Sequence, residues 1–99
     1  MLNKIGILTN DESEKILNVL NDIYKDISSG NFNIENEFED VHSKIESILI
    51  KHLGVIGKKI HTGRSRNDQV LVDFKIWMNK SNNRLINMLD QTIKNILKI

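Results

Sequence analysis

The stretch that decides the fold is RNDQVLVDFKIWMNKSNNRLINMLDQTIKNILKI, residues 66 to 99. Its apolar residues recur at steps of three and four, the period of an amphipathic helix. The polar interval from Asn79 to Asn83 is compatible with a turn, but it holds neither glycine nor proline, so we favour one continuous helix. The apolar series consists of Val70, Leu71, Phe74, Trp77, Met78, Leu85, Met88, Leu89, Ile93, Ile96 and Leu97.

The predicted helix is long for the size of the chain. A helix of about 33 residues extends about 50 Å, whereas a compact globule of this size has a radius of gyration of about 13 Å. The 99 residues suffice for one domain and are too few for two. We therefore expect the helix to overhang its own domain. Because its pattern is still helical at Ile99, we expect the sequence to be a piece of a longer chain.

Two shorter helices are predicted upstream. Thr9 and Glu12 have the spacing of a capping box, and the apolar series after them ends before Gly30, which predicts a helix over about 10–29. Acidic residues before Val41 favour a second helix over about 40–53, ended by Gly54. The loop 54–65 is expected to be a flexible connection with a short extended segment that leads into His61. The predicted fold class is all-α, with two shorter helices followed by a long one.

The composition limits the classes of function. Hydrophobic residues make up 39% and charged residues 27% of the chain, as in an ordinary soluble protein, and no apolar run is long enough to span a bilayer. The absence of cysteine excludes disulfides, thiolate zinc sites and cysteine nucleophiles. A net charge of +1 gives no general attraction for nucleic acid or an anionic membrane. Without the pattern of a secretory signal, a cytoplasmic location is expected.

The densest polar cluster is HTGRSRNDQ, residues 61–69. Ser65 and Asp68 repeat the spacing of a capping box, so the cluster lies at the predicted entry to the long helix. Backbone N–H groups and the helix dipole favour an anion there, and Arg64 and Arg66 add forked donors that match a carboxylate or phosphate. This chemistry suggests recognition of a planar carboxylate. The alternative is a capped helix with solvated arginines.

Other candidate residues carry weaker signals. The histidines are His42, His52 and His61, and their spacing does not favour a metal site. His42 shares a helix face with Ile45 and Leu49, so by default it is a partly buried packing residue. Trp77, with Phe74 and Met78, is expected in a core rather than in a stacking platform. A local basic run over 58–66 is compatible with a phosphate contact, but it lacks interleaved aromatic residues.

Three stretches closely resemble the argininosuccinate lyase family: EDVH at 39–42, KIHTGRSRNDQV at 59–70 and DFKIW at 73–77. The string HTGRSRNDQV is specific to that family within the fumarase/aspartase superfamily. Residues 6–9 and 14–17 also fit, so the resemblance covers nearly the whole chain. The family's polypeptide is several times longer, and the chain is identified as an amino-terminal fragment.

The resemblance implies a β-elimination that splits argininosuccinate into arginine and fumarate in arginine biosynthesis. It further implies a homotetramer in which the long helix joins a central bundle and each active site gathers segments from three subunits. No cofactor and no metal are expected. Ser65, Arg66 and Asn67 match the family's segment that binds the substrate's carboxylate and amino groups, and His42 matches a histidine that lines the same cleft.

The family's catalytic groups lie further downstream. Its general-base histidine follows a threonine, and its catalytic serine lies on a serine-rich loop with a Met-Pro-Gln-Lys-Lys stretch. Neither motif occurs in residues 1–99, so we expect the chain alone to be inactive. The alternative is a non-catalytic helical oligomerisation or interaction module, such as a crystallin-like reuse of the fold or a truncated remnant.

Overall fold

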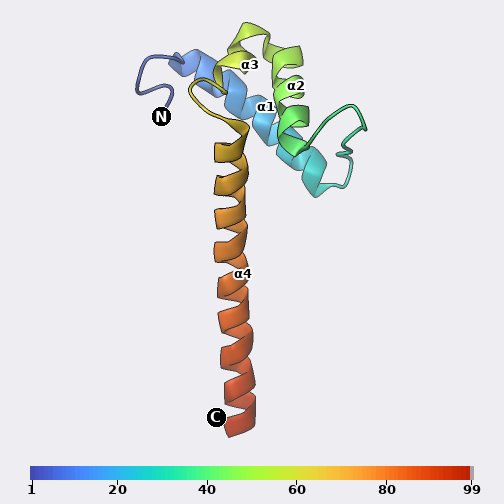
Figure 1. The fold of residues 1–99 in the computed structure, drawn as a ribbon, viewed down its shortest axis with the longest axis vertical. Coiled ribbons are helices and arrows are strands. Elements are labelled where there is room, and N and C mark those ends of the chain that lie inside the picture. Colours follow the sequence, from blue (N-terminus) through green and yellow to red (C-terminus); the bar gives the residue numbers. More distant parts are fainter. Residues whose placement is uncertain (99) are drawn as a thin grey trace. The chain divides into compact units, whose positions relative to one another are not determined.

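The computed structural model describes residues 1–98, and its regular secondary structure over that range is helical (Figure 1). This confirms the all-α class. The helices are α1 (Asn10–Ser28), α2 (Val41–Leu53), α3 (Val55–Lys59) and α4 (Arg66–Leu97). Contacts divide the chain into two compact units, Met1–Arg64 and Ser65–Ile99, and each is described by itself.

The first two helices begin at capping boxes. The N–H group of Glu12 donates to Thr9 Oγ1 at 3.1 Å, and the N–H group of Thr9 donates to the Glu12 carboxylate at 3.0 Å. Asp40 and Ser43 form the equivalent box at the start of α2. Gly30 follows α1 with φ of +76°, the left-handed conformation that the sequence predicted for a helix stop. The helices predicted over 10–29 and 40–53 are therefore confirmed to within about a residue.

Helices α1, α2 and α3 pack on one another around a small core in the first unit. Leu49 of α2 is at its centre and is 1% exposed. The other buried residues of the cluster are Leu2, Leu8 and Ile16. Partly buried apolar side chains surround them, namely Ile7, Val19, Leu20, Ile45, Leu53, Ile56 and Ile60. The residues before α1 thus contribute to the core together with the helices.

The expected extended segment in the connection 54–65 is wrong, because residues Val55–Lys59 form α3. Gly54 separates α2 from α3 with φ of +58°, a conformation that glycine adopts without strain. Gly57 lies so close to α2 that a Cβ atom there would be 2.5 Å from the carbonyl oxygen of Leu49. Glycine at this position allows the short helix to pack on the backbone of α2.

Helix α4 runs without interruption through Asn79–Asn83, as predicted. Ile99, the last residue of the expected helix, lies outside the described residues. All of the large apolar side chains of α4 are exposed, and none of its residues is buried. The second unit is therefore a single helix rather than a domain with its own core.

The expected core around Trp77 is wrong within the described residues. The rings of Phe74 and Trp77 stack with centroids 6.1 Å apart, but Trp77 is 62% exposed. The physical reason is that one helix cannot enclose its own apolar side chains.

In residues 1–98, no helix combines the length and apolar character that crossing a membrane requires.

Candidate functional site

Ser65 caps α4 and uses its polar groups to do so. Its Oγ accepts the Asp68 N–H group at 3.3 Å, and its own N–H group donates to Asp68 Oδ2 at 2.9 Å. The hydroxyl also donates to Asp68 Oδ2, at 3.1 Å. The predicted capping box is therefore confirmed. Both the hydroxyl and the N–H group of Ser65 are engaged within the helix terminus.

The Asp68 carboxylate provides a negative charge at this terminus. Its pKa lies below the ordinary value of 3.8, mainly because it accepts the Ser65 N–H group and also because it accepts the Ser65 hydroxyl. The group is therefore ionised at neutral pH, where the helix dipole favours a negative charge. A carboxylate ligand that bound at this terminus would have to lie beside the Asp68 carboxylate or take its place as the hydrogen-bond acceptor of Ser65.

Arg66 and Asn67 occupy the first turn of α4. The guanidinium Nη1 of Arg66 donates to Gln69 Oε1 at 2.7 Å, which holds the arginine side chain along the helix. Asn67 is exposed, and its side chain makes no hydrogen bond among the described residues. An amide in this position offers two donors and an acceptor to a polar ligand.

The structure brings Ser65, Arg66 and Asn67 together at one helix terminus. His42 belongs to the first unit, in the first turn of α2, where it is half-buried beside the Asp40–Ser43 box. Its position in a substrate cleft therefore stays a prediction. Arg64 also belongs to the first unit, so the two arginines that the sequence grouped together lie in different units.

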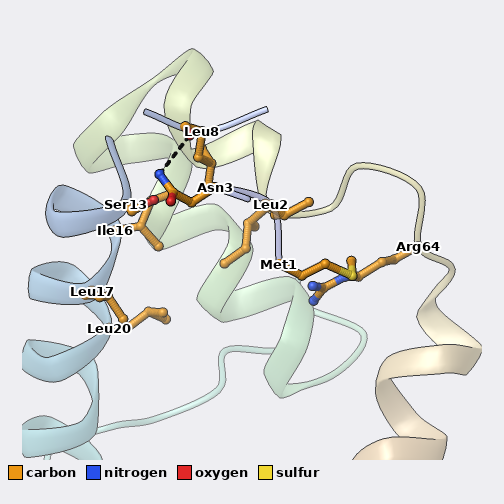
Figure 2. A pocket seen from close by; sticks show the side chains of 10 residues that line it. Met1, Leu2, Asn3, Leu8, Ser13, Ile16, Leu17, Leu20 and Arg64 are labelled. Atoms are coloured by element: carbon orange, nitrogen blue, oxygen red, sulfur yellow. Dashed lines mark hydrogen bonds between the residues drawn. The ribbon is translucent and has the colours of Figure 1, made fainter. Parts of the chain in front are cut away.

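A groove of about 330 Å³ in the first unit was missed by the sequence analysis (Figure 2). The lining side chains are mostly apolar, and the Arg64 guanidinium reaches toward Met1 at one side. Asn3 Nδ2 donates to the Leu8 carbonyl oxygen at 3.1 Å, and the buried Ser13 hydroxyl has no hydrogen-bond partner. Residues 2–8 have no helical period, so no local signal predicted that some of them would line a groove.

The described residues contain no group of three or more histidine, cysteine, aspartate or glutamate side chains arranged to hold a metal ion. Beside the Asp68 carboxylate, the start of α4 presents amide, hydroxyl and guanidinium groups as hydrogen-bond donors. These groups bind and orient anions through hydrogen bonds.

Comparisons with known proteins give consistent matches over the chain. The family model described as Lyase matches residues 1–98. An argininosuccinate lyase of Clostridium acetobutylicum is 52% identical over 97 residues, which are 95% of this chain and 22% of that protein. Argininosuccinate lyases of Carboxydothermus hydrogenoformans and Clostridium botulinum are 40% and 43% identical over 99 residues, covering all of this chain and 22% of each protein. The chain thus spans 22% of the length of these curated relatives.

Proposed function

Because the chain belongs to the lyase family, we propose that it is the amino-terminal part of an argininosuccinate lyase. The complete enzyme splits argininosuccinate into arginine and fumarate by β-elimination. The observation that carries this proposal is the start of α4, where Ser65, Arg66 and Asn67 lie in one capped helix terminus within the stretch HTGRSRNDQV. Relatives named argininosuccinate lyase match this chain over nearly all of its residues, which supports the same activity.

The proposed role of this terminus is substrate binding. In a β-elimination a base removes a proton next to a carboxylate, and negative charge builds up on that carboxylate in the transition state. Donors that are already oriented stabilise such charge. Asn67 supplies an amide, and Arg66 supplies a guanidinium whose direction is set by Gln69. An acid then assists the departure of the guanidinium group.

In the same proposal, Ser65 can bind substrate only after it gives up an existing hydrogen bond. Its hydroxyl already donates to the Asp68 carboxylate, so it donates to substrate only when the substrate carboxylate takes the place of Asp68. The exchange replaces one ionised acceptor by another and keeps the same hydrogen bond. His42 is the weaker candidate, because only the family resemblance connects it with the substrate cleft.

The test uses the complete enzyme that carries this chain as its amino-terminal part. We expect Asn67→Ala to lower kcat/KM by an amount equivalent to about 2–4 kcal/mol, by analogy with the loss of one oxyanion donor. Asn67→Asp should be at least as harmful because its charge repels a carboxylate. The readout is fumarate release followed by ultraviolet absorbance.

Two controls define this experiment. Asn82→Ala removes the same amide from an exposed position in the polar interval of α4 and should leave kcat/KM unchanged. Residues 1–99 alone should release no fumarate, because they contain neither the Thr-His pair nor the Met-Pro-Gln-Lys-Lys stretch. Near-normal kcat/KM for Asn67→Ala would place this residue outside the site, and turnover by the chain alone would contradict the assigned division of roles.

The second candidate function is a non-catalytic helical interaction module. The exposed apolar side chains of α4 favour it, because a stripe of this kind is normally covered by other helices. Within the enzyme proposal the same stripe packs in a homo-oligomer, as the family resemblance implies. A complete protein that assembles but releases no fumarate would favour the interaction module.

A further inference from the structure

His61 carries a ring nitrogen that is shielded from solvent and has no hydrogen bond. Its side chain, in the turn after α3, is 34% exposed, but Nδ1 itself is buried. Oε2 of Glu46, which projects from α2, lies 4.0 Å from Nδ1. A buried polar atom without a partner loses its hydration and gains nothing in return. Glu46 is the carboxylate that can supply the missing acceptor.

The Glu46 carboxylate is able to accept this bond in addition to others. It is 28% exposed, and an ionised carboxylate has two oxygens with about four acceptor directions. Charge-assisted N–H···O bonds have lengths of about 2.7–2.9 Å. Forming this bond therefore requires the present 4.0 Å between Nδ1 and Oε2 to shorten by about 1 Å.

The backbone of the same residue organises the turn that leads to α4. The His61 carbonyl oxygen accepts the Arg64 N–H group at 3.2 Å, and the His61 N–H group donates to the last turn of α3. Lys59 Nζ donates to Glu12 Oε1 at 2.6 Å, which ties the end of α3 to the start of α1. Residues 61–64 are thus anchored to the first unit just before the chain enters Ser65.

We propose that His61 is a positioning residue, whose Nδ1–H donates to Glu46 and holds the turn from which the Ser65–Asn67 segment continues. In the neutral ring this bond places the proton on Nδ1 and leaves Nε2 as the acceptor. The expected effect on catalysis rests on the proposed function. The His61–Glu46 bond and the tautomer of His61 do not depend on the proposed function.

Matched substitutions separate the two ring nitrogens. The amide nitrogen of asparagine stands at the same bond separation from Cβ as Nδ1, whereas that of glutamine corresponds to Nε2. His61→Asn should therefore retain the bond to Glu46, and His61→Gln should lose it. At the partner, Glu46→Gln keeps an acceptor oxygen and Glu46→Leu keeps none.

The first measurement is nitrogen NMR of the unsubstituted chain, which identifies the protonated ring nitrogen of His61 and does not depend on any variant folding. We expect the proton on Nδ1, and we expect the amide signals of residues 61–67 to shift in His61→Gln and Glu46→Leu but to stay near their native positions in His61→Asn. A proton on Nε2, or equal shifts in His61→Asn and His61→Gln, would overturn the proposal.

The second measurement is kinetic and uses the complete enzyme. We expect His61→Gln and Glu46→Leu to raise KM for argininosuccinate about tenfold with a smaller change in kcat, because a displaced binding segment weakens substrate positioning. His61→Asn should recover most of this loss. A protein with the Nδ1 proton and the expected amide shifts but without lyase activity would contradict the proposed function while supporting the His61–Glu46 bond.

Discussion

The first unit and α4 use the same kind of sequence pattern with opposite results. In Met1–Arg64, apolar residues at helical spacing meet the apolar faces of neighbouring helices and bury Leu49 almost completely. In α4, a comparable pattern leaves each large apolar side chain exposed. The comparison teaches that helical periodicity specifies a helix and an apolar face, whereas the partner that covers the face is specified by the rest of the assembly.

The largest expected effect is self-association, which would cover the exposed apolar face of α4 and remove its difference from the first unit. We predict that the chain self-associates through the stripe formed by Leu85, Leu89, Ile93 and Ile96, because large exposed apolar patches seldom persist on monomers. Leu89→Glu combined with Ile93→Glu should abolish association and leave the first two helices formed. Sedimentation equilibrium at micromolar concentrations measures the change.

A matched control uses a charge of the same sign on a polar position. Asn82→Glu lies in the polar interval of the same helix and should leave association intact. A native chain that remains monomeric would contradict the prediction and would mean that α4 tolerates its exposed stripe.

The next effect tests the core of the first unit. Leu49→Ala should lower the free energy of unfolding by about 2–5 kcal/mol, because it removes a fully buried side chain and leaves a cavity. Leu17→Ala provides the control, since Leu17 is 59% exposed on α1 and should change stability by less than about 0.5 kcal/mol. Urea denaturation followed by circular dichroism compares them. Similar losses in the two variants would refute the assignment of Leu49 to the core.

A smaller effect is expected at Gly57, where two contributions oppose each other. Alanine is the better helix former by about 1 kcal/mol, but its Cβ would lie 2.5 Å from the Leu49 carbonyl oxygen. Overpacking of this kind usually costs about 1–3 kcal/mol, and a backbone atom cannot move aside as a side chain can. Gly57→Ala should therefore destabilise the first unit in the same denaturation experiment. A stabilised variant would show that α3 is not held closely against α2.

The smallest effect concerns the cap of α4. Ser65→Ala should lower the stability of this helix by about 1 kcal/mol, whereas Ser65→Asn should retain most of the cap. Because the folded-state pKa of Asp68 lies below 3.8, the cap contributes stability above this value and loses it as the pH falls through the lowered pKa. Helicity measured against pH should show this acid loss in the native chain and a smaller loss in Ser65→Ala, which removes the hydroxyl but keeps the backbone N–H group that bonds Asp68. An identical acid profile in the two chains would separate Asp68 from the cap.

The features that the sequence predicted are those with local causes. Thr9 with Glu12, and Ser65 with Asp68, form hydrogen bonds within one helical turn, so their spacing alone places the helix starts. The short helix α3 has a different cause. It depends on the approach of Gly57 to Leu49 of another helix, and a five-residue segment has too few positions to show a period. An extended segment was therefore predicted where the structure has a helix.

The same division applies to the candidate site. The sequence placed Ser65, Arg66 and Asn67 at a helix terminus because capping chemistry and charge are readable from neighbouring residues. It did not predict that the Ser65 hydroxyl is already engaged by Asp68. Nor did it predict that His61 lies close to Glu46, because the two residues approach each other only when the turn after α3 packs on α2. The role of His42 stays a prediction for the same reason.

The continuity of α4 has a mechanical consequence. A helix of 32 residues is about 48 Å long and contains neither glycine nor proline to act as a hinge. It therefore behaves as a stiff lever, in which a tilt of about 5° at the first turn displaces the last turn by about 4 Å. Any movement of Asn67 along with its helical turn is transmitted to the apolar stripe around Ile93, so the proposed substrate-binding end and the exposed apolar face cannot move independently.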